Sequence, residues 1–99
     1  PFYADLDGHF TSKPLEGNFH GAIITTPSLG IKTWYEVDSV YKHWMIWNCE
    51  REGSFICIEP QNWRVNAPNL PLSQDESGMA SLLPGENFVA RAKIWAECL

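Results

Sequence analysis

The chain has 99 residues, of which 44% are hydrophobic and 19% are charged, a composition typical of one small globular domain. Its net charge of −5 is spread along the chain without a Lys/Arg cluster, which argues against nucleic acid and against an anionic membrane surface as partners. No apolar run approaches membrane-spanning length. The three cysteines form no CxxC pair, so we expect reduced thiols, no disulfide framework, no zinc site and a cytoplasmic location.

The first half of the chain predicts strands. Residues 18–26 predict a strand that ends at the turn-forming residues Pro27 to Gly30. Residues 31–37 alternate between two sets of side chains with a period of two, which is typical of a strand with one buried face. Residues 43–47 are apolar on both faces and, together with residues 54–59, predict a hairpin.

The second half predicts a long loop and one more regular element. Between Pro60 and Pro84 the chain is rich in Pro, Gly, Asn, Ser and Asp without periodicity, so we expect an ordered loop. Residues 86–97 fit either a strand or a helix, and the turn signal before them favours the strand. No repeat or linker divides residues 1–99, so the sequence predicts one all-β domain, an antiparallel β-sandwich.

A carboxylate stands at the end of one predicted strand. Pro60 disfavours the helical region for Glu59 and cannot donate a ladder hydrogen bond, so the strand is expected to stop with Glu59 at its rim. Phe55, Cys57 and Glu59 share one strand face, which predicts partial desolvation of the carboxylate and suits a general base. The alternative is an exposed Glu at a strand end with no special contact.

Amide and indole side chains follow this carboxylate. Gln61 and Asn69 can donate to and accept from sugar hydroxyls, and Asn69 is also placed to fix the loop after a proline. Trp63 can line a site by stacking on a pyranose ring, whereas Trp44 and Trp47 are interpreted as core residues. The site predicted from these residues therefore binds a sugar.

Other chemistry has little support in the sequence. The three histidines, His9, His20 and His43, lie on different segments without ligand or triad spacing, and we interpret them as surface or strand-edge residues. No phosphate-binding glycine loop, nucleophile elbow or metal-ligand cluster occurs. Basic residues are scarce near Glu59, with Arg64 the nearest downstream, which argues against a phosphorylated sugar.

Three segments resemble, in order and spacing, the C-terminal part of the aldose 1-epimerases, the galactose mutarotases: C-I-E-P-Q at 57–61, N-A-P-N-L at 66–70 and L-P-G-E at 83–86. The segment D-G-H-F at 7–10 also resembles that family's Asp-x-x-Phe segment. The resemblance implies part of a galactose mutarotase-like supersandwich and a hexose ligand. It further implies that Glu59 is the general base, that Asp7 contacts sugar hydroxyls, and that no cofactor is needed because only protons move.

The family takes its acid histidine and a second, substrate-binding histidine from segments upstream of the Asp-x-x-Phe region, and no histidine of this chain matches those motifs. We therefore expect a C-terminal portion of a mutarotase-like protein that holds the base without its acid and has low activity alone. Two alternatives stay open. One is a non-catalytic carbohydrate-binding β-sandwich. The other is a structural fragment that self-associates or pairs with a missing N-terminal segment through exposed sheet edges.

Overall fold

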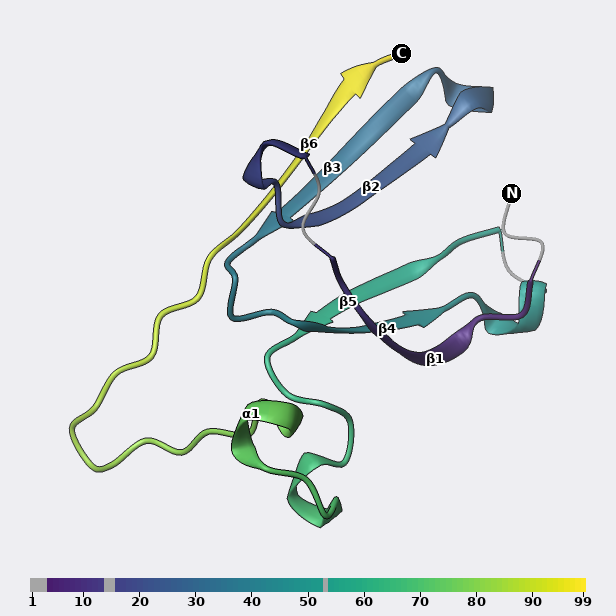
Figure 1. Ribbon diagram of the computed structural model, residues 1–99. Helices are drawn as coiled ribbons and strands as arrows, with labels where there is room; N and C mark the ends of the chain where they lie inside the picture. The colour runs from purple at the N-terminus through teal and green to yellow at the C-terminus, as the bar shows by residue number, and fades with distance from the viewer. Residues whose placement is uncertain (1–3, 14–15, 53) are drawn as a thin grey trace. The chain divides into compact units, whose positions relative to one another are not determined.

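The computed structural model describes residues 4–13, 16–52 and 54–99, and these form two antiparallel sheets of three strands each (Figure 1). The strands are β1 Asp7–Thr11, β2 Gly21–Thr26, β3 Ile31–Val37, β4 His43–Trp47, β5 Cys57–Gln61 and β6 Ala92–Cys98. One sheet has the order β1-β4-β5 and the other the order β2-β3-β6. The all-β class expected from the sequence is confirmed.

Helical structure is limited to short turns in the described part of the chain. These are the 3-10 turns Glu16–Asn18, Pro27–Leu29, Cys49–Arg51 and Ala67–Asn69, and one α-helical turn, α1, at Gln74–Ser77. None of the helices found in the described ranges is long and apolar enough to cross a membrane.

Each sheet belongs to its own compact unit. The unit with β1, β4 and β5 comprises Pro1–Ser12 and Val40–Phe88, and the unit with β2, β3 and β6 comprises Lys13–Ser39 and Val89–Leu99. All the residues that the sequence predicts for the site, from Asp7 to Asn69, lie in the first of these units. We call it the β4 unit, after its central strand, and the other the β3 unit.

The β3 unit is organised by a pair of tryptophans. Trp34 on β3 is the cross-strand partner of Trp95 on β6, and their rings stack with centroids 5.7 Å apart and an interplanar angle of 2°. Glu97 accepts a hydrogen bond from the Trp34 indole N–H at 3.0 Å, and the Lys32 ammonium lies 4.1 Å from the centroid of Trp34. Aromatic stacking and the Trp34–Glu97 hydrogen bond thus hold the edge strand β6 against β3, while the cation–π contact lies within β3.

In the β4 unit, the central strand β4 pairs with β1 on one side and with β5 on the other. Trp44 on this strand is buried with 4% of its surface exposed, as expected for a core residue. Trp47 is 39% exposed and packs edge-on against Phe55, so its interpretation as a core residue is wrong. Asn48, directly after the strand, is 1% exposed and hydrogen-bonds the N-terminal segment.

Several predicted element boundaries shift. The ranges of β3 and β4 are as predicted, and the last element is the strand alternative, beginning only at Ala92. The strand with Glu59 does not stop there, because β5 continues through Pro60 to Gln61. A proline is tolerated because β5 is an edge strand. On such a strand the proline nitrogen, which has no hydrogen to donate, can face away from the neighbouring strand.

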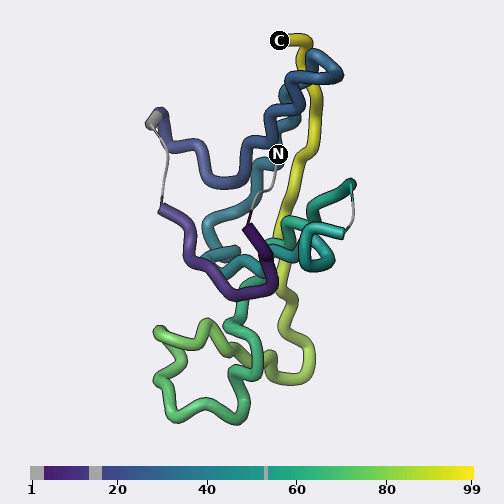
Figure 2. Tube along the Cα trace, turned by 90° about the vertical axis from the view of Figure 1, so that its right-hand side faces the viewer, coloured from purple at the N-terminus to yellow at the C-terminus, as the bar shows by residue number. Residues whose placement is uncertain are grey.

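The long segment after β5 is an ordered loop, as predicted, although it contains helical turns (Figure 2). Ser73 caps α1, since its hydroxyl accepts from the Glu76 backbone N–H at 3.2 Å and the Glu76 carboxylate accepts from the Ser73 backbone N–H at 3.1 Å. Further along, the Glu86 carboxylate accepts from the Leu83 N–H at 2.9 Å and closes a turn at Gly85. Side-chain caps therefore replace regular secondary structure in this loop.

Replacing Trp95 with Ala is expected to destabilise the β3 unit by about 2 kcal/mol, because it removes the stacked ring and leaves one face of Trp34 without its aromatic partner. Urea unfolding monitored by circular dichroism measures the change. Ile94→Ala is the matched control, since Ile94 on the same strand is 63% exposed and should cost less than about 1 kcal/mol. Equal losses in the two variants would contradict a stabilising role for the tryptophan pair.

Candidate functional site

The register of the β4 unit brings the predicted polar residues to one sheet face. Direct cross-strand partners in an antiparallel sheet point to the same side. The rows across the sheet are Asp7–Trp47–Cys57, His9–Met45–Glu59 and Thr11–His43–Gln61. Asp7, Glu59 and Gln61 therefore share a face, and two histidines that sequence reasoning had not placed in the site join them.

His9 and His43 form a hydrogen-bonded pair on this face, which we call the histidine pair. The Nε2 atom of His9 lies 2.9 Å from the Nδ1 atom of His43, and the ring centroids are 5.1 Å apart. His43 is only 6% exposed, so its interpretation as a surface or strand-edge residue is wrong, whereas His9 does lie on the edge strand β1. His20, in the β3 unit, bonds through its ring to the carbonyls of Val37 and Asp38.

The hydrogen bond between His9 and His43 fixes how their other two ring nitrogens can hydrogen-bond. A neutral imidazole carries one N–H, so one ring donates to the other and the direction depends on the tautomer. Either way, the two outer nitrogens, Nδ1 of His9 and Nε2 of His43, have opposite roles. One is a donor and the other is an acceptor.

Burial and nearby positive charge lower the pKa of both histidines in this pair. Burial lowers the pKa of His9 below 6.5, and the positive charge of Arg64 lowers that pKa further. For His43, burial again lowers the pKa most, followed by electrostatic interaction with His9 and with the positive charges of Arg64 and Lys42. Both shifts favour the uncharged form of the imidazoles.

Glu59 lies inside β5 and its side chain is exposed. The partial desolvation expected from its apolar neighbours is thus absent, and the carboxylate is open to solvent or a ligand. On the same row, His9 lies across β4 from Glu59, and two strand spacings place their Cα atoms about 10 Å apart. Asp7 is likewise exposed, at the start of β1.

Gln61 and Trp63 line a cavity of about 530 Å³ beside this face. Its other walls are Tyr41 and the segment from 60 to 68, including Arg64. Glu59 and Asn69 are not among the lining residues. The Asn69 amide donates to the Asn66 side chain at 2.7 Å, which supports the prediction that Asn69 fixes the loop.

Gly78 closes the loop over His43. Its φ of 72° lies in the left-handed region, and a Cβ there would clash with the Asn62 carbonyl and come 3.2 Å from Nε2 of His43. The backbone N–H of Arg64 donates to the carbonyl of Ser77 at 2.7 Å, directly before this glycine. The loop that carries α1 is therefore held against the end of the sheet where the histidine pair lies.

No group of three or more His, Cys, Asp or Glu suited to a metal ion occurs within the described ranges. The sequence signal that could have identified the histidine pair is weak. His9 stands in the D-G-H-F segment and His43 opens a predicted strand, but only the pairing of β1 with β4 brings them together. That pairing joins positions 34 residues apart.

No protein-family model matches the chain. Among solved structures, it is similar to a galactose mutarotase-like protein from Clostridium acetobutylicum, with a TM-score of 0.88 and 32% sequence identity. The match covers 98% of this chain and 30% of that chain, so this chain spans less than a third of its neighbour's length. The chain therefore has the galactose mutarotase-like fold, which confirms the fold expected from the sequence resemblance.

Gly78→Ala is expected to destabilise the protein by about 1–3 kcal/mol, because the added methyl group meets backbone at a left-handed position. Chemical denaturation measures this change. Gly85→Ala is the control, since Gly85 also has a positive φ, of 87°, but no atom lies within 4 Å of the position that a Cβ would occupy there. If both variants lose the same stability, the close packing of Gly78 on Asn62 contributes nothing.

Stability should fall as the pH decreases through about 6.5. The folded pKa of each paired histidine is depressed, so in this window the unfolded chain binds more protons than the folded chain. The free energy of unfolding therefore decreases until the pH lies below the folded pKa values, where it levels off. Urea unfolding at pH values from about 7.5 to about 5 measures the slope, and the double variant His9→Gln/His43→Gln should flatten it. An unchanged slope in that variant would contradict the assignment.

Proposed function

We propose that this chain carries the general base of an aldose 1-epimerase-like reaction, which interconverts the α and β anomers of a hexose. The observation that carries the proposal is Glu59, an exposed carboxylate on a polar sheet face in a chain with the galactose mutarotase-like fold. The three segments that resemble the aldose 1-epimerases support it, because Glu59 stands at the position of that family's base.

In the proposed reaction, Glu59 takes the proton from the anomeric hydroxyl while an acid protonates the ring oxygen, and the bond between that oxygen and the anomeric carbon breaks. The resulting aldehyde rotates about its bond to the next carbon. The hydroxyl formed from the ring oxygen then attacks the other face of the aldehyde carbon and closes the ring as the other anomer, and the protons return. Asp7 and Gln61 would bind sugar hydroxyls, Trp63 would pack on the ring, and Asn69 would hold the loop.

We further propose that the chain is the C-terminal portion of a longer mutarotase-like protein that functions in the cytoplasm. The chain spans less than a third of the neighbour's length, and the C-terminal position is proposed from the three segments that resemble the C-terminal part of the aldose 1-epimerases. In that protein, upstream segments would supply the acid histidine. Residues 1–99 alone should accordingly show little mutarotation, and association with the N-terminal portion should restore it.

A non-catalytic carbohydrate-binding role is the second candidate, and one observation favours it. Gln61 and Trp63 line the cavity of the β4 unit, whereas Glu59 does not. In such a protein Glu59 would only accept hydrogen bonds from hydroxyls. Titration calorimetry with galactose and glucose separates the candidates, because sugar binding that survives Glu59→Gln without any anomerisation would favour the binding role.

The test of the catalytic proposal is polarimetry of freshly dissolved α-galactose and α-glucose with the longer protein. Glu59→Gln should lower the rate by at least about 10²-fold, since the amide cannot take the proton. Glu36→Gln is the matched control, because Glu36 is an exposed strand carboxylate in the β3 unit. Full activity of Glu59→Gln would overturn the proposal. Enzyme-like, Glu59-dependent turnover by residues 1–99 alone would overturn the proposal that upstream segments of a longer protein supply the acid.

A further inference from the structure

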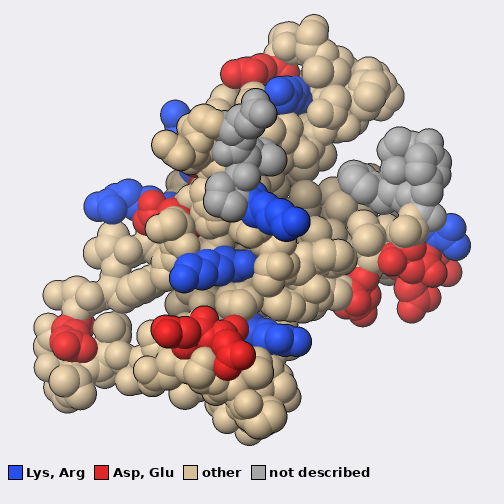
Figure 3. All heavy atoms as spheres, in the orientation of Figure 1, with Lys and Arg blue, Asp and Glu red and all other residues tan. Residues whose placement is uncertain are grey.

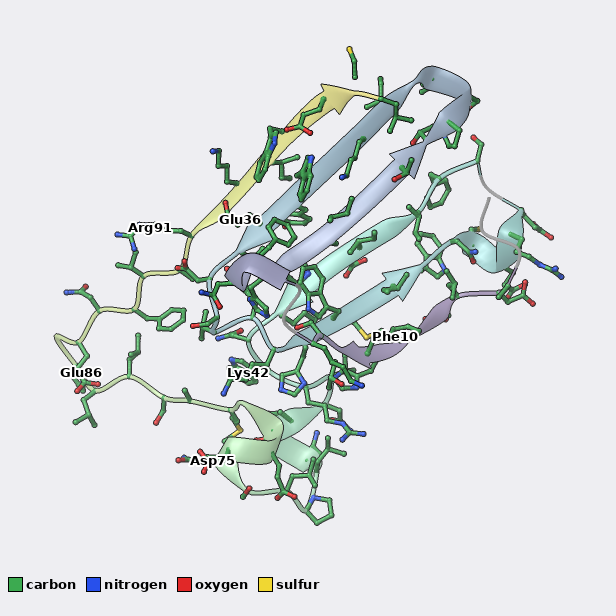
Figure 4. The ribbon with its side chains drawn as sticks, turned by 45° about the horizontal axis from the view of Figure 1, so that its top comes forward. Phe10, Glu36, Lys42, Asp75, Glu86 and Arg91 are labelled. Carbon is green, nitrogen blue, oxygen red and sulfur yellow. The ribbon has the colours of Figure 1, made fainter. Side chains whose placement is uncertain are left out.

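The outer strand β6 of the β3 unit leaves one of its edges open. It pairs with β3 on one side, and no other strand pairs with it within the described residues (Figure 4). Its residues are exposed except for the half-buried Trp95, so neither face of the strand is fully covered. A seven-residue strand with an open edge, no proline and an unbroken register is able to pair with a further strand.

The hydrogen bonds that flank β6 show which of its backbone groups face the open edge. Before the strand, the Asp38 N–H donates to the Arg91 carbonyl at 3.0 Å. After it, the Leu99 N–H donates to the Gly30 carbonyl at 2.8 Å. Both pairs continue the register of β3 with β6, in which hydrogen-bonded and non-hydrogen-bonded pairs alternate. The odd-numbered residues of β6 therefore bond to β3, whereas the N–H and C=O groups of the even-numbered residues point to the open edge.

One face of β6 carries opposite charges on either side of an aromatic ring. Lys93, Trp95 and Glu97 lie on this face, because side chains alternate along a strand. The Lys93 ammonium lies 4.8 Å from the centroid of the Trp95 ring, and the Glu97 carboxylate accepts from the Trp95 indole N–H at 3.4 Å. Trp95 thus stands midway between a cation and an anion, and this order reverses when the strand is turned end to end.

We propose that β6 is the contact surface between two copies of this chain, which pair their β6 strands antiparallel about a twofold axis at Trp95. In this register Trp95 lies opposite Trp95 of the second copy. Lys93 lies opposite Glu97 of the second copy, and the twofold axis repeats this ion pair at the other end of the contact. The three-stranded sheets of the two copies then become one continuous sheet.

The backbone agrees with this register. When Trp95 pairs with itself, the odd-numbered residues become the non-hydrogen-bonded pairs of the new contact. The even-numbered residues, whose N–H and C=O groups face the open edge, then form its hydrogen-bonded pairs, Ile94 with Ala96 and Ala92 with Cys98. Side chains approach more closely in non-hydrogen-bonded pairs, so the charged side chains meet in the closer arrangement.

The charges on β3 extend the complementarity beyond β6. Glu36 is the cross-strand partner of Lys93, and Lys32 is the cross-strand partner of Glu97. A row that crosses the joined sheet would run Glu36 and Lys93 in one copy, then Glu97 and Lys32 in the other, so opposite charges alternate along it. An in-register parallel pairing would instead bring like charges together. On the face that Figure 3 shows, neither sign gathers in a large patch, so single charges and not patches must set the register.

The row between the two charged rows is apolar. Ile23, Trp34 and Trp95 are cross-strand neighbours, and the rings of the two tryptophans stack. Pairing at Trp95 would continue this row into the second copy. On the opposite face it would reduce the exposure of Ile94, which is 63% exposed. Burial of apolar surface would therefore add to the backbone hydrogen bonds.

Charge-swap variants of the 99-residue chain test the contact by sedimentation equilibrium. Lys93→Glu alone and Glu97→Lys alone each place like charges opposite one another, so each should dimerise at least about tenfold more weakly than the unchanged chain. An equal mixture of the two variants should restore the affinity, because every pair then joins a cation to an anion. Glu52→Lys is the matched control, since it makes the same charge change at an exposed acid of the β4 unit.

Hydrogen exchange of the β6 amides gives a second readout. Dimerisation should slow exchange at Ile94 and Ala96, whose N–H groups face the open edge. Exchange should change less at Lys93 and Trp95, whose N–H groups already bond to β3. Fast exchange at Ile94 and Ala96 in a dimer would place the contact on another surface and overturn the proposal.

Three further results would overturn this contact. They are a chain that stays monomeric at about 100 μM, a mixture of the two variants that does not dimerise, and an equal effect of Glu97→Lys and Glu52→Lys. The other possible occupant of the edge is a strand of a longer protein. A monomeric longer protein in which the Ile94 and Ala96 amides exchange slowly would assign the edge to that strand and would exclude the second copy. None of these readouts involves Glu59, so the contact is tested independently of the proposed function.

Discussion

The site depends on the register of β4 with both of its neighbours. Because side chains alternate between the two faces of a strand, a slip of one residue would turn the carboxylates and imidazoles to the opposite face. Two contacts fix this register between β1 and β4. Asn48 accepts from the Leu6 N–H at 3.0 Å and donates to the Ala4 carbonyl at 2.9 Å, while the histidine pair joins the strands further along. The contact that stabilises the sheet is therefore part of the proposed site.

The hydrogen bond between the two histidines also constrains their charge. A buried imidazole needs a hydrogen-bond partner, and each ring supplies one for the other without introducing charge. The positive charges of Lys42 and Arg64 oppose protonation of His43, and Arg64 also opposes protonation of His9, so a neutral pair is favoured.

Local patterns were sufficient to predict the strands whose residues alternate or are continuously apolar, such as β3 and β4. They were insufficient where neighbours decide the outcome. Pro60 argued for the end of a strand, but the strand continues to Gln61, and an edge strand tolerates a proline. Glu59 and Gln61 were predicted as site residues, and the structure does bring them to one face. His43 was missed because its contact with His9 is a non-local pairing that no short window contains.

The β4 unit also has large apolar side chains at its open edges. Its outer strands, β1 and β5, each pair with β4 alone within the described residues, so each presents an unpaired edge. Phe10 on β1 and Phe55 just before β5 are exposed. Large apolar side chains at open edges are typical of surfaces that other chain segments cover.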